Sequence, residues 1–281
     1  MITVNNMSFS YTKKPYMESL NFHVSEGEIF GFLGPSGAGK STLQKILTGV
    51  LINYSGSVLV NHQEVKHANV DFYEEVGVDF EFPSLYEKLS GRENLKYFAS
   101  LYKNQGDIDQ ALRSVGLTQD ADKRVMYYSK GMKSRLNFIK ALIHNPQIIF
   151  LDEPTSGLDP TNAKIMKDLI MQERDKGKTI ILTTHNMHDA QELCDRVAFI
   201  VDGQIKAIDT PHNLIMSKGA TKINYGYISD NQQITRQVII NKTSDDQQLL
   251  SAILENRITH IHSSEPNLND IFMEITGRTL I

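Results

Sequence analysis

The chain has 281 residues, of which 22% are charged and 40% hydrophobic, and its formal net charge at pH 7 is −4. This length suits one large domain or two smaller ones, and the composition is that of an ordinary globular protein. Lysine and arginine are scattered and form no basic stripe, which argues against nucleic acid as the main partner.

The sequence also carries signals for location. No apolar run approaches the roughly 18 residues that span a bilayer, and residues 1–6 contain neither a basic nor an apolar segment of a secretory signal. The single cysteine, Cys194, lies in an apolar-faced helical pattern, which indicates a structural thiol. We therefore expect a cytoplasmic protein that acts at a membrane only by docking on another protein.

Short apolar runs separated by turns fill the chain up to residue 80. They predict strands over residues 2–4, 20–24, 29–33, 57–60, 63–65 and 76–78. Residues 84–145 then have helical spacing throughout, and Ser90 with Glu93 forms a capping box at the start of one of the helices. This pattern indicates a helical block inserted between the halves of an α/β domain.

The α/β pattern resumes at Pro146. Continuous apolar runs over residues 148–151 and 179–183 predict parallel strands that are buried on both faces. Helices are expected over residues 163–176 and 186–194, followed by a hairpin over 197–208 and a short helix that starts at 210–211. From residue 218 the composition becomes more polar, which predicts a small α+β appendage with helices over 246–256 and 269–277 and a strand over 258–262.

A glycine-rich loop follows the third predicted strand and precedes a helical pattern. It matches G-x-x-x-x-G-K-[ST] and consists of Gly34, Pro35, Ser36, Gly37, Ala38, Gly39, Lys40, Ser41 and Thr42. Such a loop aims backbone N–H groups and a helix N-terminus at phosphate oxygens. Lys40 is then expected to contact the β- and γ-phosphates, and the Ser41 hydroxyl to bind Mg²⁺. The alternative is a glycine-rich turn before an ordinary helix, and the four constrained positions with the right flanks argue against it.

An acidic pair ends the predicted strand over residues 148–151. Asp152 and Glu153 are thereby expected at the carboxyl edge of the sheet, where α/β folds bind ligands. Alone the pair is a weak signal. Together with the phosphate loop it predicts that Asp152 holds Mg²⁺ through its water shell and that Glu153 polarises the attacking water.

Two single residues admit both a structural and a functional interpretation. His185 follows the strand predicted over residues 179–183, at the place expected for a γ-phosphate, which favours contact with that phosphate over a structural role. Tyr11 lies between the first two predicted strands, and its ring either packs against the protein or stacks on a base.

A second anion-binding helix start is indicated just before the third helix of the helical block. Ser129 and Gly131 lie there, within the run Tyr128-Ser129-Lys130-Gly131-Met132. Without further context, a capped helix start is the simpler interpretation.

Five motifs in this order resemble the ATP-binding subunits of ABC transporters. They are the phosphate loop over residues 34–42, the signature over 129–132, the run over 150–153, the run over 156–159, and His185. The resemblance covers about residues 1–215. It implies an α/β fold, namely a P-loop NTPase core with a RecA-like mixed sheet, an antiparallel β subdomain and an inserted helical subdomain over about 84–145. We therefore assign the ATP-binding domain to residues 1–217 and the α+β appendage to 218–281.

The resemblance also implies a mechanism. ATP is bound with Mg²⁺ and hydrolysed, and two subunits form a head-to-tail homodimer or pseudo-dimer around two ATP molecules. Ser129 and Gly131 of one subunit close on the γ-phosphate held by the other, and Tyr11 stacks on adenine. The subunit lies on the inner face of the cell membrane, where its helical block, near residues 82–86, docks on an integral membrane permease.

Two positions depart from the family pattern. The usual Leu-Ser-Gly-Gly-Gln signature is replaced by the run at 128–132, although Ser129 and Gly131 are kept. Glu81 occupies the place of a usual glutamine. Its carboxylate is a candidate ligand for Mg²⁺ or a metal-bound water.

These departures and the C-terminal tail indicate which subfamily the chain resembles. The tail over residues 265–278 is similar to that of bacterial multidrug, antibiotic and bacteriocin-immunity exporters with separately encoded permeases. The resemblance implies export of a drug, antibiotic, peptide or lipid-like substrate. The alternatives are an importer ATPase, or a non-transport ABC ATPase that acts on DNA or ribosomes. A non-transport ABC ATPase would carry a long coiled-coil insertion or a second cassette, and the sequence contains neither.

Overall fold

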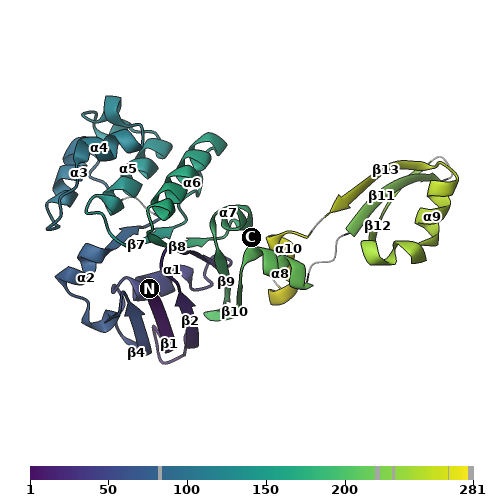
Figure 1. Cartoon of the computed structure of the whole chain (residues 1–281), viewed down its shortest axis with the longest axis horizontal. Helices are drawn as coiled ribbons and strands as arrows, with labels where there is room; N and C mark the ends of the chain where they lie inside the picture. Colours follow the sequence, from purple (N-terminus) through teal and green to yellow (C-terminus); the bar gives the residue numbers. More distant parts are fainter. Residues whose placement is uncertain (82–83, 219–221, 230–231, 265, 278–281) are drawn as a thin grey trace. The chain divides into compact units, whose positions relative to one another are not determined.

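The computed structural model describes the chain except residues 82–83, 219–221, 230–231, 265 and 278–281 (Figure 1). Packing divides it into two units at Ile208 and Asp209. The composition shift predicts a boundary after residue 217. The boundary found here is earlier because α8 (Pro211–Lys218) packs on α10 (Leu268–Thr276) within the second unit.

A six-stranded sheet forms the centre of the first unit, with the order β10-β9-β3-β8-β7-β6. Its strands are β3 (Ile29–Leu33), β6 (Val76–Asp79), β7 (Ile148–Asp152), β8 (Thr179–Thr184), β9 (Arg196–Val201) and β10 (Gln204–Asp209). Strands β9, β3, β8, β7 and β6 pair in parallel. Every residue of β3, β7 and β8 is buried, as their unbroken apolar runs predict. The carboxyl ends of these strands therefore meet at one edge, where polar residues follow the apolar ones.

A second, antiparallel sheet has the order β2-β1-β4-β5. Its strands are β1 (Ile2–Phe9), β2 (Met17–Val24), β4 (Tyr54–Val60) and β5 (Gln63–Glu64). Phe22 of this sheet stacks on Phe30 of β3, so one hydrophobic core joins both sheets. Figure 1 shows α1 (Lys40–Leu47) close to both sheets.

The helical block lies between β6 and β7 in the chain and contains α3 (Gly91–Ala99), α4 (Ile108–Ser114) and α5 (Lys130–Leu142). The predicted capping box is present: Ser90 Oγ accepts from the Glu93 backbone N–H, and the Glu93 carboxylate accepts from the Ser90 N–H. The remaining helices of the first unit are α2 (Val70–Glu75), α6 (Pro160–Asp175), α7 (Met187–Leu193) and the 3₁₀ helices η1 (Val65–His67), η2 (Thr118–Asp120) and η3 (Val125–Tyr127). The α/β fold with an antiparallel subdomain and inserted helices is thus confirmed.

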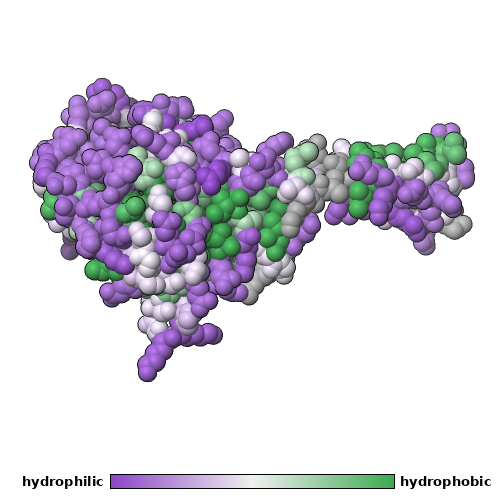
Figure 2. Space-filling view, turned by 60° about the horizontal axis from the view of Figure 1, so that its bottom comes forward, coloured by the Kyte–Doolittle hydropathy of each residue, from purple (hydrophilic) through white to green (hydrophobic). Residues whose placement is uncertain are grey.

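The second unit contains a small antiparallel sheet with the order β12-β11-β13. Its further elements are β11 (Lys222–Ser229), β12 (Gln232–Ile239), η4 (Ile240–Asp245), α9 (Gln247–Leu254) and β13 (Ile258–Ser264). A small core forms where Tyr225 and Tyr227 of β11 pack with Leu249 and Ala252 of α9. Figure 2 shows hydrophobic surface along this unit. Among the described residues, no helix is long and apolar enough to cross a membrane.

Candidate active site

The phosphate loop connects the buried end of β3 to the start of α1. Gly34 begins it against the backbone of β9, where a Cβ atom would lie 2.1 Å from the carbonyl oxygen of Ile200, so only glycine fits there. The Lys40 side chain folds back into the loop, and its Nζ donates to the carbonyls of Gly34 at 2.7 Å and Pro35 at 3.2 Å. Burial lowers the Lys40 pKa, and the nearby carboxylates of Glu153 and Asp152 oppose that shift.

A cavity of about 310 Å³ opens over this loop. Its lining residues come from the loop and from four other places in the chain: Tyr16, Pro35, Ser36, Gly37, Ala38, Gly39, Lys40, Ser41, Thr42, Glu81, Glu153 and His185. The structure therefore brings Glu81, Glu153 and His185 to the loop, as expected from the sequence.

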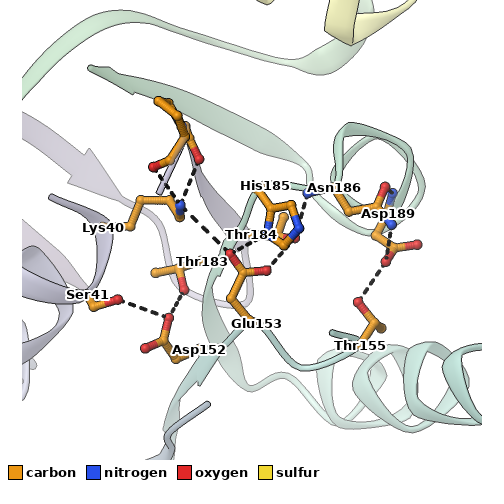
Figure 3. A network of polar contacts seen from close by, with 12 residues as sticks. Lys40, Ser41, Asp152, Glu153, Thr155, Thr183, Thr184, His185, Asn186 and Asp189 are labelled. Atoms are coloured by element: carbon orange, nitrogen blue, oxygen red, sulfur yellow. Dashed lines mark hydrogen bonds and ion pairs between the residues drawn. The ribbon is translucent and has the colours of Figure 1, made fainter. Parts of the chain in front are cut away.

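Asp152 is the last residue of β7 and is 8% exposed. Its Oδ1 accepts hydrogen bonds from Ser41 Oγ at 3.5 Å and from the hydroxyl of Thr183, on the neighbouring strand (Figure 3). A hydroxyl and a carboxylate side by side supply the hard oxygen ligands that Mg²⁺ prefers, so these residues fit a magnesium site.

Glu153 and His185 form a direct pair at the carboxyl ends of β7 and β8. His185 Nδ1 lies 2.9 Å from Glu153 Oε1, and Lys40 Nζ lies 3.8 Å from the same oxygen (Figure 3). The Thr184 hydroxyl donates to the other carboxylate oxygen of Glu153 at 3.2 Å. Glu153 has a φ of +52°, a left-handed conformation that is uncommon outside glycine and asparagine. The carboxylate is thus held by three partners in an unusual backbone conformation.

The aromatic residue that lines the cavity is Tyr16, whereas the sequence predicts Tyr11. Tyr11 is 59% exposed and is not a lining residue, but its hydroxyl lies 2.9 Å from Thr42 Oγ1, which does line the cavity. Tyr16 is a lining residue that sequence reasoning missed, and its hydroxyl donates to the carbonyl of Gly37 at 2.9 Å. Burial, and next the neighbouring Tyr11, raise the Tyr16 pKa. No local pattern marks Tyr16, since only the turn between β1 and β2 brings it to the loop.

Ser129 and Gly131 do not line the cavity. Ser129 is the N-cap of α5, and its Oγ accepts from the Met132 backbone N–H at 3.2 Å. Gly131 lies against the side chain of Asn162 on α6, where a Cβ atom would come within 2.4 Å. The signature helix of this chain therefore starts against α6 of the same chain, and its Ser129 and Gly131 lie outside the lining of the cavity over the phosphate loop.

A second cavity, of about 390 Å³, shares Glu81 and Glu153 with the first. Asp152, Glu153 and Glu81 line it together with Tyr128 and residues of α5. Phe82 and Pro83, part of the expected permease-docking segment over 82–86, lie outside the described residues.

A phosphate loop between a buried parallel strand and a helix, with an acidic residue at the end of the strand two places along the sheet, defines a P-loop nucleoside triphosphatase. Residues 17–156 match the model of the family described as "ABC transporter". The chain is 46% identical to a "Fluoroquinolones export ATP-binding protein" of Mycobacterium tuberculosis, over all of this chain and 94% of that protein. The chain belongs to the ABC transporter family of ATP-binding proteins.

Other relatives agree with this assignment. A "Linearmycin resistance ATP-binding protein" of Bacillus subtilis is 29% identical over all of this chain and 99% of its own length, and a "Nod factor export ATP-binding protein I" of Rhizobium etli is 32% identical over 99% and 94%. A solved "ATP binding subunit of ABC transporter" superposes with a TM-score of 0.70 and 27% identity, over 77% of this chain and 92% of that one. The protein is thus an ATP-binding, ATP-hydrolysing subunit of an ABC transporter, a class that works with membrane permease components.

Proposed function

We propose that the phosphate loop binds the triphosphate of ATP together with Mg²⁺. Lys40 and the loop N–H groups would hold the β- and γ-phosphates. Ser41 and Asp152 would hold the metal, with Glu81 as a further candidate because it lines the same cavity. Tyr11 is the proposed adenine-stacking residue, which its exposed ring supports, and Tyr16 lies close enough to share this role because the two ring centroids are 5.8 Å apart. Mg²⁺, when bound, supplies charge neutralisation of the phosphates.

We propose Glu153 as the general base and His185 as the contact to the γ-phosphate. A base must lie within hydrogen-bond reach of the proton that it takes, and Glu153 borders the cavity next to Lys40. His185 is 58% exposed, so its ring has a free side toward the cavity while Nδ1 engages Glu153. The single observation that carries this proposal is that Lys40 Nζ and His185 Nδ1 both contact the same oxygen of Glu153, Oε1.

The signature is proposed to act on the ATP of a second subunit. Ser129 is exposed at the N-terminus of α5, which supports anion binding there, but it does not line the cavity of its own chain. A head-to-tail homodimer, or a pseudo-dimer with a second ATP-binding subunit, would bring this helix end to the partner's phosphates.

The transport direction is proposed to be export, with a drug, antibiotic, peptide or lipid-like substrate. The support is the name of the relative that is 46% identical over this whole chain, together with those of the linearmycin-resistance and Nod-factor-export relatives. The subunit would then lie on the cytoplasmic face of the cell membrane against a separately encoded permease.

Affinity purification of this chain from its own membranes, with and without ATP, tests the proposal. We expect a polytopic membrane subunit to co-purify, and cells that carry Glu153→Gln to lose resistance to the exported compound. Recovery of ribosomes or DNA in place of a membrane subunit would contradict the transport function.

A further inference from the structure

A buried carboxylate outside the cavity joins the two segments that carry Glu153 and His185. Asp189, on α7, is 7% exposed. Its Oδ2 accepts hydrogen bonds from Thr155 Oγ1 at 2.7 Å and from Asn186 Nδ2 at 2.9 Å (Figure 3). Thr155 follows Glu153 by two residues, and Asn186 directly follows His185. One carboxylate therefore holds both loops just beyond the pair.

These contacts close into a ring. The backbone N–H of Asn186 donates to Thr184 Oγ1 at 2.9 Å, and the same hydroxyl donates to Glu153 Oε2 at 3.2 Å. A hydroxyl carries one hydrogen and two lone pairs, so Thr184 can fill both roles. The path runs from Glu153 through Thr184, Asn186, Asp189 and Thr155, and it returns to Glu153 along the backbone.

The ring accounts for the unusual backbone of Glu153. A left-handed φ at a residue other than glycine persists only where its surroundings over-determine it. His185 is largely exposed, so packing does little to fix its ring. Hydrogen bonds on both sides of the pair supply that constraint.

The other carboxylate oxygen of Asp189 lies near a lysine. Its Oδ1 lies 3.4 Å from Nζ of Lys167 on α6, and Lys167 also pairs with Glu192. His188, Asp189 and Glu192 have the spacing of possible metal ligands, but the Lys167 ammonium already lies among them. Asp189 is therefore a hydrogen-bond acceptor whose partners are in place.

We propose that Asp189 is a positioning residue for ATP hydrolysis. Through Thr155 and Asn186 it holds the Glu153 carboxylate and the His185 imidazole in their 2.9 Å pair. This inference rests on the proposed role of Glu153 as the base. Neither Thr155 nor Asp189 lines the cavity, so their effect on ATP binding is expected to be small.

The test compares Thr155→Val, which removes the hydroxyl at nearly constant shape, with Thr155→Ser, which keeps it. For Thr155→Val we expect kcat to fall about tenfold, the size of one lost buried hydrogen bond, with the Kd for ATP within about twofold of wild type. Thr155→Ser should keep at least about half of the wild-type kcat, because its hydroxyl can still reach Asp189.

Two further variants separate positioning from lost stability. Ile170→Val, in the core-facing side of α6, should lower the melting temperature while kcat stays at the wild-type value. The double variant Thr155→Val with Asp189→Ala should be no slower than Asp189→Ala alone, because the hydroxyl then has no carboxylate to contact.

Wild-type kcat in Thr155→Val would overturn the inference, as would an equal loss in Thr155→Ser or additive losses in the double variant. The Glu153→Gln variant tells the two proposals apart. If it hydrolyses ATP normally, the base assignment fails. If it is inactive while Thr155→Val is normal, only the role of Asp189 fails.

Discussion

His185 Nδ1 lies 2.9 Å from Glu153 Oε1, although 32 residues separate the two in the chain. The parallel pairing of β7 with β8 makes this possible, because both strands end at the same edge of the sheet. The Glu153 carboxylate also lies 3.8 Å from Lys40 Nζ, so contacts within this chain hold its orientation. We expect loss of either member of the pair to affect hydrolysis more than binding.

Glu153→Gln should bind ATP but hydrolyse it at least about 100-fold more slowly, because an amide cannot accept the proton of the attacking water. The ATP-bound form should then accumulate as a dimer, which size-exclusion chromatography in saturating ATP measures. Glu26→Gln, at an exposed position in the turn before β3, is the matched control and should behave as wild type. Normal turnover by Glu153→Gln would rule out its role as the base.

His185→Ala should lower kcat about 10- to 100-fold with a smaller change in the Kd for ATP, since the Glu153 partner is lost while the loop is intact. His188 provides a control three residues further along, because its side chain is 82% exposed. Steady-state kinetics of His185→Ala and His188→Ala compare the two positions. Equal effects of the two substitutions would contradict a specific role for His185.

Gly34→Ala should abolish detectable ATP binding by isothermal titration, because the added Cβ would lie 2.1 Å from the Ile200 carbonyl and the loop would have to move. Gly177→Ala is the matched substitution, with a φ of +86° and open space around it. It should cost about 1 kcal/mol of stability and leave the affinity for ATP unchanged. Tight binding of ATP by Gly34→Ala would show that the loop has another conformation available.

Ser129→Arg should prevent dimerisation in saturating ATP, because it places a long side chain at the exposed start of α5. The fraction of dimer, measured by light scattering in the Glu153→Gln background, checks this. Ser114→Arg, exposed at the end of α4, should leave the dimer population unchanged. If the Glu153→Gln protein dimerises equally with and without Ser129→Arg, the proposed head-to-tail dimer, in which Ser129 and Gly131 meet the partner's phosphates, is incorrect.

His144 predicts a pH dependence of stability. Its side chain is 2% exposed, stacks on Tyr102 and contacts the Val76 carbonyl at 3.2 Å. Burial lowers its pKa to about 4, whereas the unfolded chain takes up the proton below about 6.5. The unfolded state then binds more protons, so stability falls by up to about 3 kcal/mol as the pH drops from 6.5 to 4.

His144→Phe, which keeps the stacking, should lose this part of the pH dependence. Urea unfolding at pH 7.5 and pH 5 measures the difference between the variant and wild type. An identical pH slope in both proteins would show that another group is responsible.

Short-range patterns predict much of the site. The loop over residues 34–42 and the acidic pair at 152–153 have local signatures, because strand–loop–helix geometry is set by adjacent residues. Tyr16 and Asp189 carry no such signature. Their partners are Gly37 and Thr155, 21 and 34 residues away, and only tertiary packing brings them together.

The distinction between local signatures and long-range packing also explains which elements of the fold the sequence predicts. The capping box at Ser90 and the hairpin signal at 202–203 are local, and the structure contains both elements. The sequence does not predict strands β11 and β12 individually. Strand β12 is largely exposed, and β11 buries three consecutive residues, so neither shows regular apolar alternation. Helix α2 was also missed, since its six residues bury only Phe72.

The turn between β9 and β10 touches the phosphate loop directly, because the Gly203 backbone N–H donates to the Ala38 carbonyl at 2.9 Å. The same turn lies against the segment that carries Tyr16, because a Cβ atom at Gly203 would come within 1.9 Å of the Tyr16 carbonyl oxygen. One hairpin turn therefore contacts both Ala38 and Tyr16, which line the cavity from two different segments of the first unit. A side chain at residue 203 would push these two segments apart and widen the cavity on this side.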